Sequence, residues 1–359
     1  MNRISIFAVC ALFCGFHMAD AGVLTSEQKL EKVKAHNEAF QALNEKVRDP
    51  FVLKGPDGFF YMTGTTAGTS WGETAGIKIW KSRDLAEWKD LGFVWELERD
   101  GKDDWFFDVP LKRTGPMRER TIWAPEIHCM NGTWWVPLSA NTGGHSLLKS
   151  TTGRIEGPYD ALPLMDGPHN IDSHLYEENG EVYYCYQADF IAKMKPDMSG
   201  LAEEKTKLKH KGNHPLGYEG ILMLKIGDKY LHIASGRYGY EPTDTYDLYY
   251  TVSKNLYGPY GKRRMALKNA GHGNLFQDHE GRWWSTAFDH EFFTEGMQNW
   301  SLWLVPVEIE ETEDDLIIRS KDPRFQPSED DQRVVEELSK TGPPAAWKGK
   351  ARWWRPEGK

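Results

Sequence analysis

The chain has 359 residues, of which 40% are hydrophobic and 27% are charged, and it contains 34 glycines and 19 prolines. This composition supports a large folded core and excludes a disordered, collagen-like or coiled-coil protein. The net charge is -9 and the basic residues are scattered, so no nucleic acid or membrane partner is expected. Aromatic residues make up 13% of the chain, which favours a β-rich protein with surfaces on which sugars stack.

Residues 1–21 are predicted to be a signal peptide. A basic start at Arg3 precedes an apolar run over 4–16 and a small-residue cleavage site at Ala19-Asp20-Ala21. The run is too short to span a membrane, so we expect a secreted or periplasmic protein that begins at Gly22. A lipid anchor on Cys14 is the alternative, and the bulky residue before this cysteine argues against it.

Residues 22–47 are predicted to form a short N-terminal helical segment. Apolar side chains recur here at helical spacing among charged residues, which is the pattern of an amphipathic helix or helix pair. The apolar positions are Leu30, Val33, Ala39, Phe40, Leu43 and Val47.

From residue 48 onward, short runs of alternating apolar residues are separated by Gly, Asn and Asp, as in antiparallel strands. A turn with a glycine followed by an aromatic strand recurs five times, with the glycines 74, 48, 47 and 54 residues apart. Such repeats predict an all-β, five-bladed β-propeller over 48–322, with an insertion over 96–120 and a C-terminal tail over 323–359. The five glycines are Gly58, Gly132, Gly180, Gly227 and Gly281.

Unusual residues stand eight or nine positions before each hairpin glycine, where each blade's first strand begins. First strands line the central channel of a propeller, so these positions are expected to converge at one mouth of the channel. The convergence would place three carboxylates, an imidazole and an indole around one pocket. The residues are Asp49, Trp123, Asp172, Glu219 and His272.

Such a pocket suits glycoside hydrolysis. That reaction needs one carboxylate as a base for water and one carboxylic acid to protonate the leaving oxygen. A third carboxylate can tune the acid, because neighbouring negative charges raise the pKa of the group in the less polar place. Trp123 offers a sugar-stacking wall, with a place in the core as the alternative. His272 is a candidate to hold a metal ion or water on the axis, with a hydrogen bond across the axis as the alternative.

The segments that carry these residues resemble glycoside hydrolase family 43, a family of five-bladed propeller glycosidases. The resemblance covers roughly residues 48–310 and implies that Asp49 is the general base, Asp172 the pKa modulator that orients the acid, and Glu219 the general acid. It also implies that His272 helps to hold a calcium ion through water; the chemistry itself requires no cofactor. The matching stretches are Arg48-Asp49-Pro50-Phe51-Val52, Trp123-Ala124-Pro125-Glu126-Ile127-His128, Ile171-Asp172-Ser173-His174, Tyr218-Glu219-Gly220 and Gly271-His272-Gly273-Asn274.

Some residues depart from this pattern or have simpler explanations. Ser173 and Ile221 stand where the family commonly has proline, which we interpret as an altered subsite shape. Arg237 is a candidate to bind a substrate hydroxyl or carboxylate, although a solvated or structural arginine is the ordinary interpretation. Glu126 and His128 are interpreted as a structural pair within a strand.

The sequence therefore predicts a secreted, inverting glycoside hydrolase for arabinose-, xylose- or galactose-type glycans. One alternative is a propeller that binds glycans without cleaving them, and the intact set of carboxylates argues against it. Another is a carbohydrate lyase, which needs a tyrosine or histidine base beside a charge-neutralising group. The histidines that keep this alternative open are His145, His169, His174 and His290.

Overall fold

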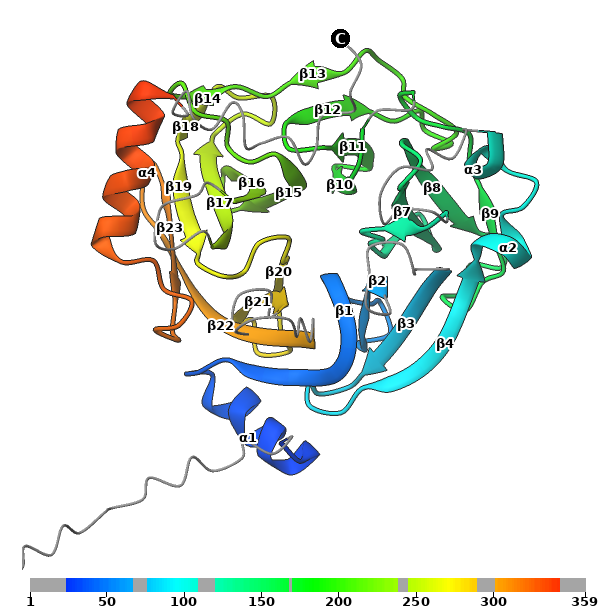
Figure 1. The fold of residues 1–359 in the computed structure, drawn as a ribbon, viewed down its shortest axis with the longest axis horizontal. Coiled ribbons are helices and arrows are strands. Elements are labelled where there is room, and N and C mark those ends of the chain that lie inside the picture. Colours follow the sequence, from blue (N-terminus) through cyan, green and yellow to red (C-terminus); the bar gives the residue numbers. More distant parts are fainter. Residues whose placement is uncertain are drawn as a thin grey trace, which may run out of the picture.

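Small antiparallel sheets surround a common axis and make up most of the protein (Figure 1). The computed structural model describes residues 24–66, 76–108, 120–167, 170–237, 245–288 and 301–342. One eight-stranded sheet comprises two blades that share β1, and three further sheets each form one blade. The predicted all-β, five-bladed propeller is confirmed.

Each blade begins with the strand nearest the axis and proceeds outward. Blade one contains β1 (Phe40–Lys54), β2 (Phe60–Thr66), β3 (Gly76–Ser82) and β4 (Lys89–Glu96). Blade two contains β5 (Ile122–Trp123), β6 (His128–Met130), β7 (Thr133–Ala140), β8 (His145–Ser150) and β9 (Tyr159–Ala161). Blade three contains β10 (Ser173–Glu178), β11 (Glu181–Tyr186), β12 (Phe190–Lys193) and β13 (Thr206–Lys207).

The last two blades complete the ring. Blade four contains β15 (Glu219–Ile226), β16 (Lys229–Arg237), β17 (Tyr246–Ser253) and β19 (Arg264–Leu267). Between blades three and four, β14 (His210–Lys211) pairs in parallel with β18 (Tyr260–Lys262). Blade five contains β20 (Leu275–Gln277), β21 (Trp283–Phe288), β22 (Ser301–Glu311) and β23 (Leu316–Ser320).

The five predicted hairpins all form between the first two main strands of each blade. Their glycines have φ between 59 and 78°. In two of the hairpins an asparagine before the glycine is also left-handed, at Asn131 and Asn179. Two consecutive positive φ angles give the turn whose twist matches the flanking strands, which is why Asn-Gly is the commonest sequence for it.

The ring is closed by the N-terminal strand. The first part of β1 pairs with β22 of blade five, where Phe40 faces Leu304, and the second part pairs with β2 of blade one. In Figure 1 this strand curves from the outside of the ring to its centre. The first residues of the propeller and its last blade are thus held in one sheet.

The prediction of a helical segment over 22–47 is wrong in its second half. Helix α1 (Ser26–Ala35) begins at the N-cap Thr25 and ends at the left-handed His36. Residues 40–47 then belong to β1, in which buried Phe40 and Ala42 alternate with more exposed neighbours. Pairing with β22 and burial of Phe40 override an apolar spacing that fits a helix by coincidence.

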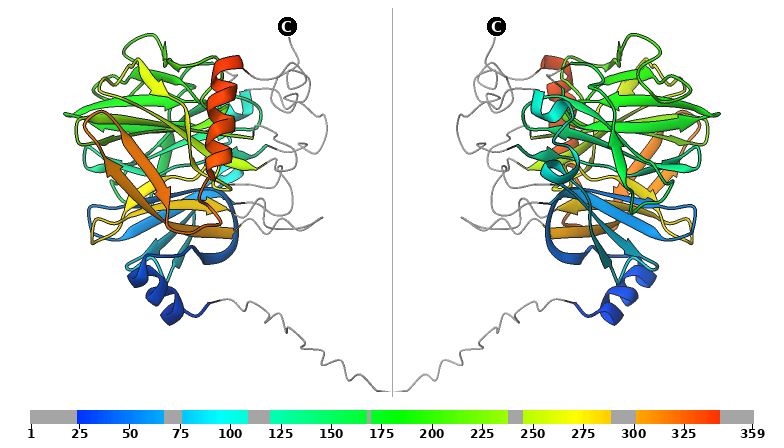
Figure 2. Two further views of the ribbon diagram at one scale, coloured as in Figure 1. Left: turned by 90° about the vertical axis from the view of Figure 1, so that its left-hand side faces the viewer. Right: turned by 90° about the vertical axis from the view of Figure 1, so that its right-hand side faces the viewer.

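The described segments outside the blades are short. The insertion after blade one contains α2 (Leu97–Asp100) and α3 (Trp105–Asp108). In the predicted tail, α4 (Glu329–Thr341), the red helix in Figure 2, contacts β19. Its Val335 belongs to one buried apolar cluster with Tyr249 and Met265. None of the helices in the described ranges has the length and apolar character needed to cross a bilayer.

Candidate active site

One residue near the start of each blade's first strand has a left-handed backbone. Four of these residues donate their N–H to a side-chain oxygen of the preceding blade: Ala124 to Thr65, Asp172 to Ser139, Gly220 to Asp172 and His272 to Ser235. These bonds are 2.6–3.1 Å long and tie each blade to the one before it. The five left-handed residues are Asp49, Ala124, Asp172, Gly220 and His272.

The sequence predicts that Asp49, Trp123, Asp172, Glu219 and His272 occupy equivalent positions. In blades two and four the predicted residue instead lies one position before the equivalent one. Trp123 and Glu219 stand one position before the left-handed residues of their blades, as Arg48 stands before Asp49. Consistently, Arg48, Trp123 and Glu219 pair with Thr65, Ser139 and Ser235 of their second strands. A left-handed residue interrupts the alternation of side chains along a strand, so the side chains of two neighbouring positions can both face the mouth of the channel.

Asp49 lies in contact with the His272 ring. Its Oδ1 is 3.1 Å from His272 Nδ1, and its Oδ2 accepts a 2.6 Å hydrogen bond from the Thr65 hydroxyl. Burial alone would raise the pKa of Asp49, but the charge and hydrogen bond of His272 outweigh it and hold the pKa at about 2. Asp49 is therefore ionised at neutral pH, as a general base must be.

Glu219 and Asp172 form the second half of the site. Burial and the negative charge of Asp172 raise the pKa of Glu219 to about 8, so Glu219 retains its proton at neutral pH. Asp172 is itself buried, and its pKa is about 6 because burial and Asp49 outweigh the opposing charge of His272. Its Oδ2 accepts the N–H of Gly220, the residue after Glu219, at 3.1 Å. Asp172 thus raises the pKa of Glu219 through its negative charge and holds the backbone next to Glu219 through a hydrogen bond.

His272 lies between the two aspartates. Nδ1 faces Asp49 at 3.1 Å and Nε2 faces Asp172 at 4.0 Å. Burial would lower the pKa of His272, but the two carboxylates raise it to about 10. The ring is therefore an imidazolium at neutral pH, with protons on both nitrogens. Gly220 accommodates this ring, because a Cβ there would lie 2.9 Å from His272 Cδ2.

The calcium role that the resemblance implies for His272 runs through water and not through direct coordination, and it stays a prediction. The cavity beside His272 is lined by residues from four blades, among them the two carboxylates Asp49 and Glu126. With His272 protonated, the imidazolium itself supplies the positive charge next to these groups.

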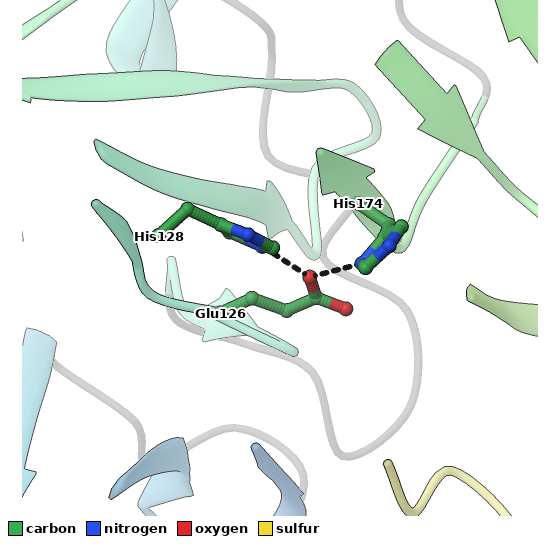
Figure 3. A group of neighbouring side chains, drawn as sticks. All are labelled: Glu126, His128 and His174. Carbon is green, nitrogen blue, oxygen red and sulfur yellow. Dashed lines mark hydrogen bonds and ion pairs between the residues drawn. The ribbon is translucent and has the colours of Figure 1, made fainter. Parts of the chain in front are cut away.

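Glu126, His128 and His174 form a second buried cluster, shown in Figure 3. Glu126 Oε2 accepts from His128 Nε2 at 2.8 Å and from His174 Nδ1 at 2.7 Å. These three residue types can bind metals, but tetrahedral ligands at about 2.0–2.1 Å from zinc stand roughly 3.3 Å apart. The observed separations are those of hydrogen bonds. The cluster joins blades two and three and confirms the structural pairing of Glu126 with His128.

The remaining predicted residues are placed as follows. Trp123 is only 6% exposed, in the same strand position as Arg48 and Glu219. Arg237 is the last residue of β16, and its side chain lies outside what the structure describes. His145 is buried and bonded to the Tyr184 hydroxyl, and burial lowers its pKa to about 3. His169 and His290 are outside the described residues.

Two residues of the site have no role in the sequence-based prediction. Arg48 is 1% exposed and interacts electrostatically with Asp49 and Glu219. Tyr246 donates its hydroxyl proton to Glu219 Oε1 at 2.5 Å. Arg48 precedes Asp49 in one of the matched stretches, which was an available signal. Tyr246 lies among many aromatic strand residues, and no pattern distinguishes it from them.

The fold is a five-bladed propeller, and the mouth of its channel holds two carboxyl groups, Asp49 and Glu219, whose pKa values lie on opposite sides of neutrality. Residues 42–299 match glycosyl hydrolases family 43, and the chain belongs to this family.

Comparison with individual proteins gives more distant matches. A protein of Escherichia coli (strain K12) named "Putative beta-xylosidase" is 25% identical over 273 residues, which are 66% of this chain and 46% of that protein. The chain thus spans just under half the length of this relative.

Solved structures share the fold. The GH43 BlXynB protein of Bacillus licheniformis superposes with a TM-score of 0.60 at 21% identity, covering 80% of this chain and 58% of that one. An exo-1,5-alpha-L-arabinanase from a bovine ruminal metagenomic library gives 0.59 at 16% identity, covering 78% and 99%. An endo-arabinase from Bacteroides thetaiotaomicron VPI-5482 gives 0.55 at 17% identity, covering 76% and 98%.

Proposed function

We propose that this protein is an exported glycoside hydrolase that cleaves arabinose-, xylose- or galactose-type glycans with inversion at the anomeric carbon. One observation carries the proposal: Asp49 and Glu219 share one site, and their pKa values, about 2 and about 8, lie on opposite sides of neutrality. Two carboxyl groups held in opposite protonation states are what acid–base glycoside cleavage requires.

The proposed reaction is a single displacement. Asp49 removes a proton from a water molecule, and the oxygen of that water attacks the anomeric carbon. The C–O bond to the leaving group breaks, its electron pair stays on the glycosidic oxygen, and Glu219 gives that oxygen a proton. Asp172 keeps the pKa of Glu219 high, and the His272 imidazolium keeps Asp49 ionised.

The names of the relatives support the sugar class. One is named "Putative beta-xylosidase", one an exo-1,5-alpha-L-arabinanase and one an endo-arabinase, and these names refer to the pentoses xylose and arabinose. Galactose-type glycans remain within the proposal because the loops over 67–76, 100–120 and 239–247, which the sequence predicts to shape the pocket mouth, lie in part outside the described residues.

The decisive experiment follows hydrolysis by proton NMR with aryl glycosides of the three sugars. We expect turnover of at least one, with a first-formed sugar of the anomeric configuration opposite to that of the substrate. Retained configuration, or transfer of the sugar to added methanol, would contradict Asp49 as base. Binding of oligosaccharides without any turnover would instead support the non-cleaving alternative.

A further inference from the structure

Tyr246 holds one oxygen of the proposed acid. It is the first residue of β17, is 6% exposed, and places its hydroxyl 2.5 Å from Glu219 Oε1. Burial raises the pKa of Tyr246 well above its ordinary value, so the hydroxyl keeps its proton and acts as the donor. The contact joins the third strand of blade four to the first residue of that blade's first strand.

The ring of Tyr246 is fixed from several sides. It stacks on Tyr218 at a centroid distance of 6.4 Å and meets Phe288 edge-on at 6.1 Å. Gly271 donates its N–H to the Tyr246 carbonyl at 2.9 Å, and a Cβ on Gly271 would lie 2.5 Å from Cγ of the ring. Glycine is therefore required at 271 for the ring to occupy this place, next to the first strand of blade five.

This contact makes the two carboxyl oxygens of Glu219 different, because the Tyr246 hydroxyl donates to Oε1. A hydroxyl group that donates to Oε1 is best accommodated when Oε1 carries no proton of its own. The acid proton is then left on Oε2. Only one of the two oxygens can therefore face the leaving group as an acid.

We propose that Tyr246 is a positioning residue, which places the transferable proton of Glu219 on Oε2 and aims it at the glycosidic oxygen. The proposal rests on the proposed hydrolase function. In the transfer, the Oε2–H bond of Glu219 breaks and the proton joins the leaving oxygen, while the Tyr246 O–H bond stays intact and stabilises the carboxylate that forms.

The test compares two aryl glycosides of one sugar in the wild type and Tyr246→Phe. For a leaving group that needs protonation, we expect kcat/KM to fall roughly 10- to 100-fold, the range for a lost hydrogen bond to a charged group. For a dinitrophenyl leaving group, which needs little protonation, the decrease should be much smaller. Equal loss on both substrates would overturn the proposal.

A pH profile gives a second readout that a purely structural role would not change. The Tyr246 hydroxyl stabilises ionised Glu219, so its removal should raise the pKa of the acid and move the basic limb of kcat/KM to higher pH. The other groups that act on Glu219 stay in place in this variant: Asp172, Asp49, His272 and Arg48. An unchanged limb would contradict the proposal.

Two further variants separate the position of the Tyr246 ring from the general effect of losing a buried hydroxyl group. Gly271→Ala keeps the hydroxyl but displaces the ring, so it should reproduce the substrate dependence of Tyr246→Phe. Tyr249→Phe, in the same strand, removes a buried hydroxyl that donates to Asp247 at 3.2 Å and should leave that dependence unchanged. If the wild type cleaves no glycoside, the proposed function fails. If it does and Gly271→Ala behaves like the wild type, only the role of Tyr246 fails.

Discussion

Asp172 acts on Glu219 through its charge and through the Gly220 N–H. We expect Asp172→Asn to lower the pKa of Glu219, because the negative charge that raises it is gone. The basic limb of the pH profile of kcat/KM should therefore move to lower pH, by roughly one unit or more. Asp278→Asn, a buried aspartate of blade five bonded to Trp284, is the matched control and should leave the limb in place.

His272 gives a prediction about metals. If a calcium ion is held through water beside His272, as the resemblance implies, a chelator should lower activity or melting temperature, and added calcium should restore it. His272→Gln should raise the pKa of Asp49 and move the acidic limb of the profile to higher pH. No response to the chelator would leave His272 as a hydrogen-bonding and charged partner of Asp49.

At the scale of elements, the left-handed residue in or next to each first strand orients the residues that we propose to be catalytic. Asp172 has φ 55° and is held by the 2.6 Å hydrogen bond from its N–H to the buried Ser139 hydroxyl. Removing that acceptor leaves a buried N–H without its partner.

Ser139→Ala should therefore lower the free energy of unfolding by about 1–3 kcal/mol, measured by urea denaturation. Activity should also fall, because Asp172 loses its backbone support. Ser199→Ala, at an exposed turn, is the control and should change stability by less than about 0.5 kcal/mol. A Ser139 variant as stable as the control would show that this hydrogen bond between blades contributes little.

At the scale of the whole molecule, stability depends on closing the ring. Phe40 is 2% exposed and packs edge-on against Trp284, in the part of β1 that pairs with blade five. We expect Phe40→Ala to cost about 3–5 kcal/mol, measured by thermal and urea unfolding. Phe93→Ala, which truncates a side chain that is 43% exposed, should cost far less. Similar losses in both variants would argue against closure through β1.

Export is a separate prediction for the whole chain. The signal-peptide pattern over 1–21, which lies outside the described residues, predicts that the secreted protein begins at Gly22. Mass spectrometry of the intact protein from a secreting host would show this directly. A mature chain that keeps Arg3, or a lipid on Cys14, would reject it.

The sequence by itself determined the blade count and the catalytic candidates. The hairpin signals are local: a glycine or Asn-Gly pair adopts its turn whatever surrounds it, so five turns at regular spacing were visible without a structure. The three carboxylates could be found because acidic residues are unusual at the start of channel-lining strands.

Only the tertiary structure decided how the ring closes and how the site is charged. Residues 40–47 are a strand because β22, more than 250 residues away, offers a partner, and no local pattern contains that information. The shift of Trp123 and Glu219 by one position depends on single φ angles. The charge of His272 arises between blades, and the contact of Tyr246 with Glu219 arises between two strands of blade four that are 27 residues apart in sequence. Electrostatic and hydrogen-bonding partners distant in sequence are set by packing, and they decide the pKa values that support the proposed roles of Asp49 and Glu219.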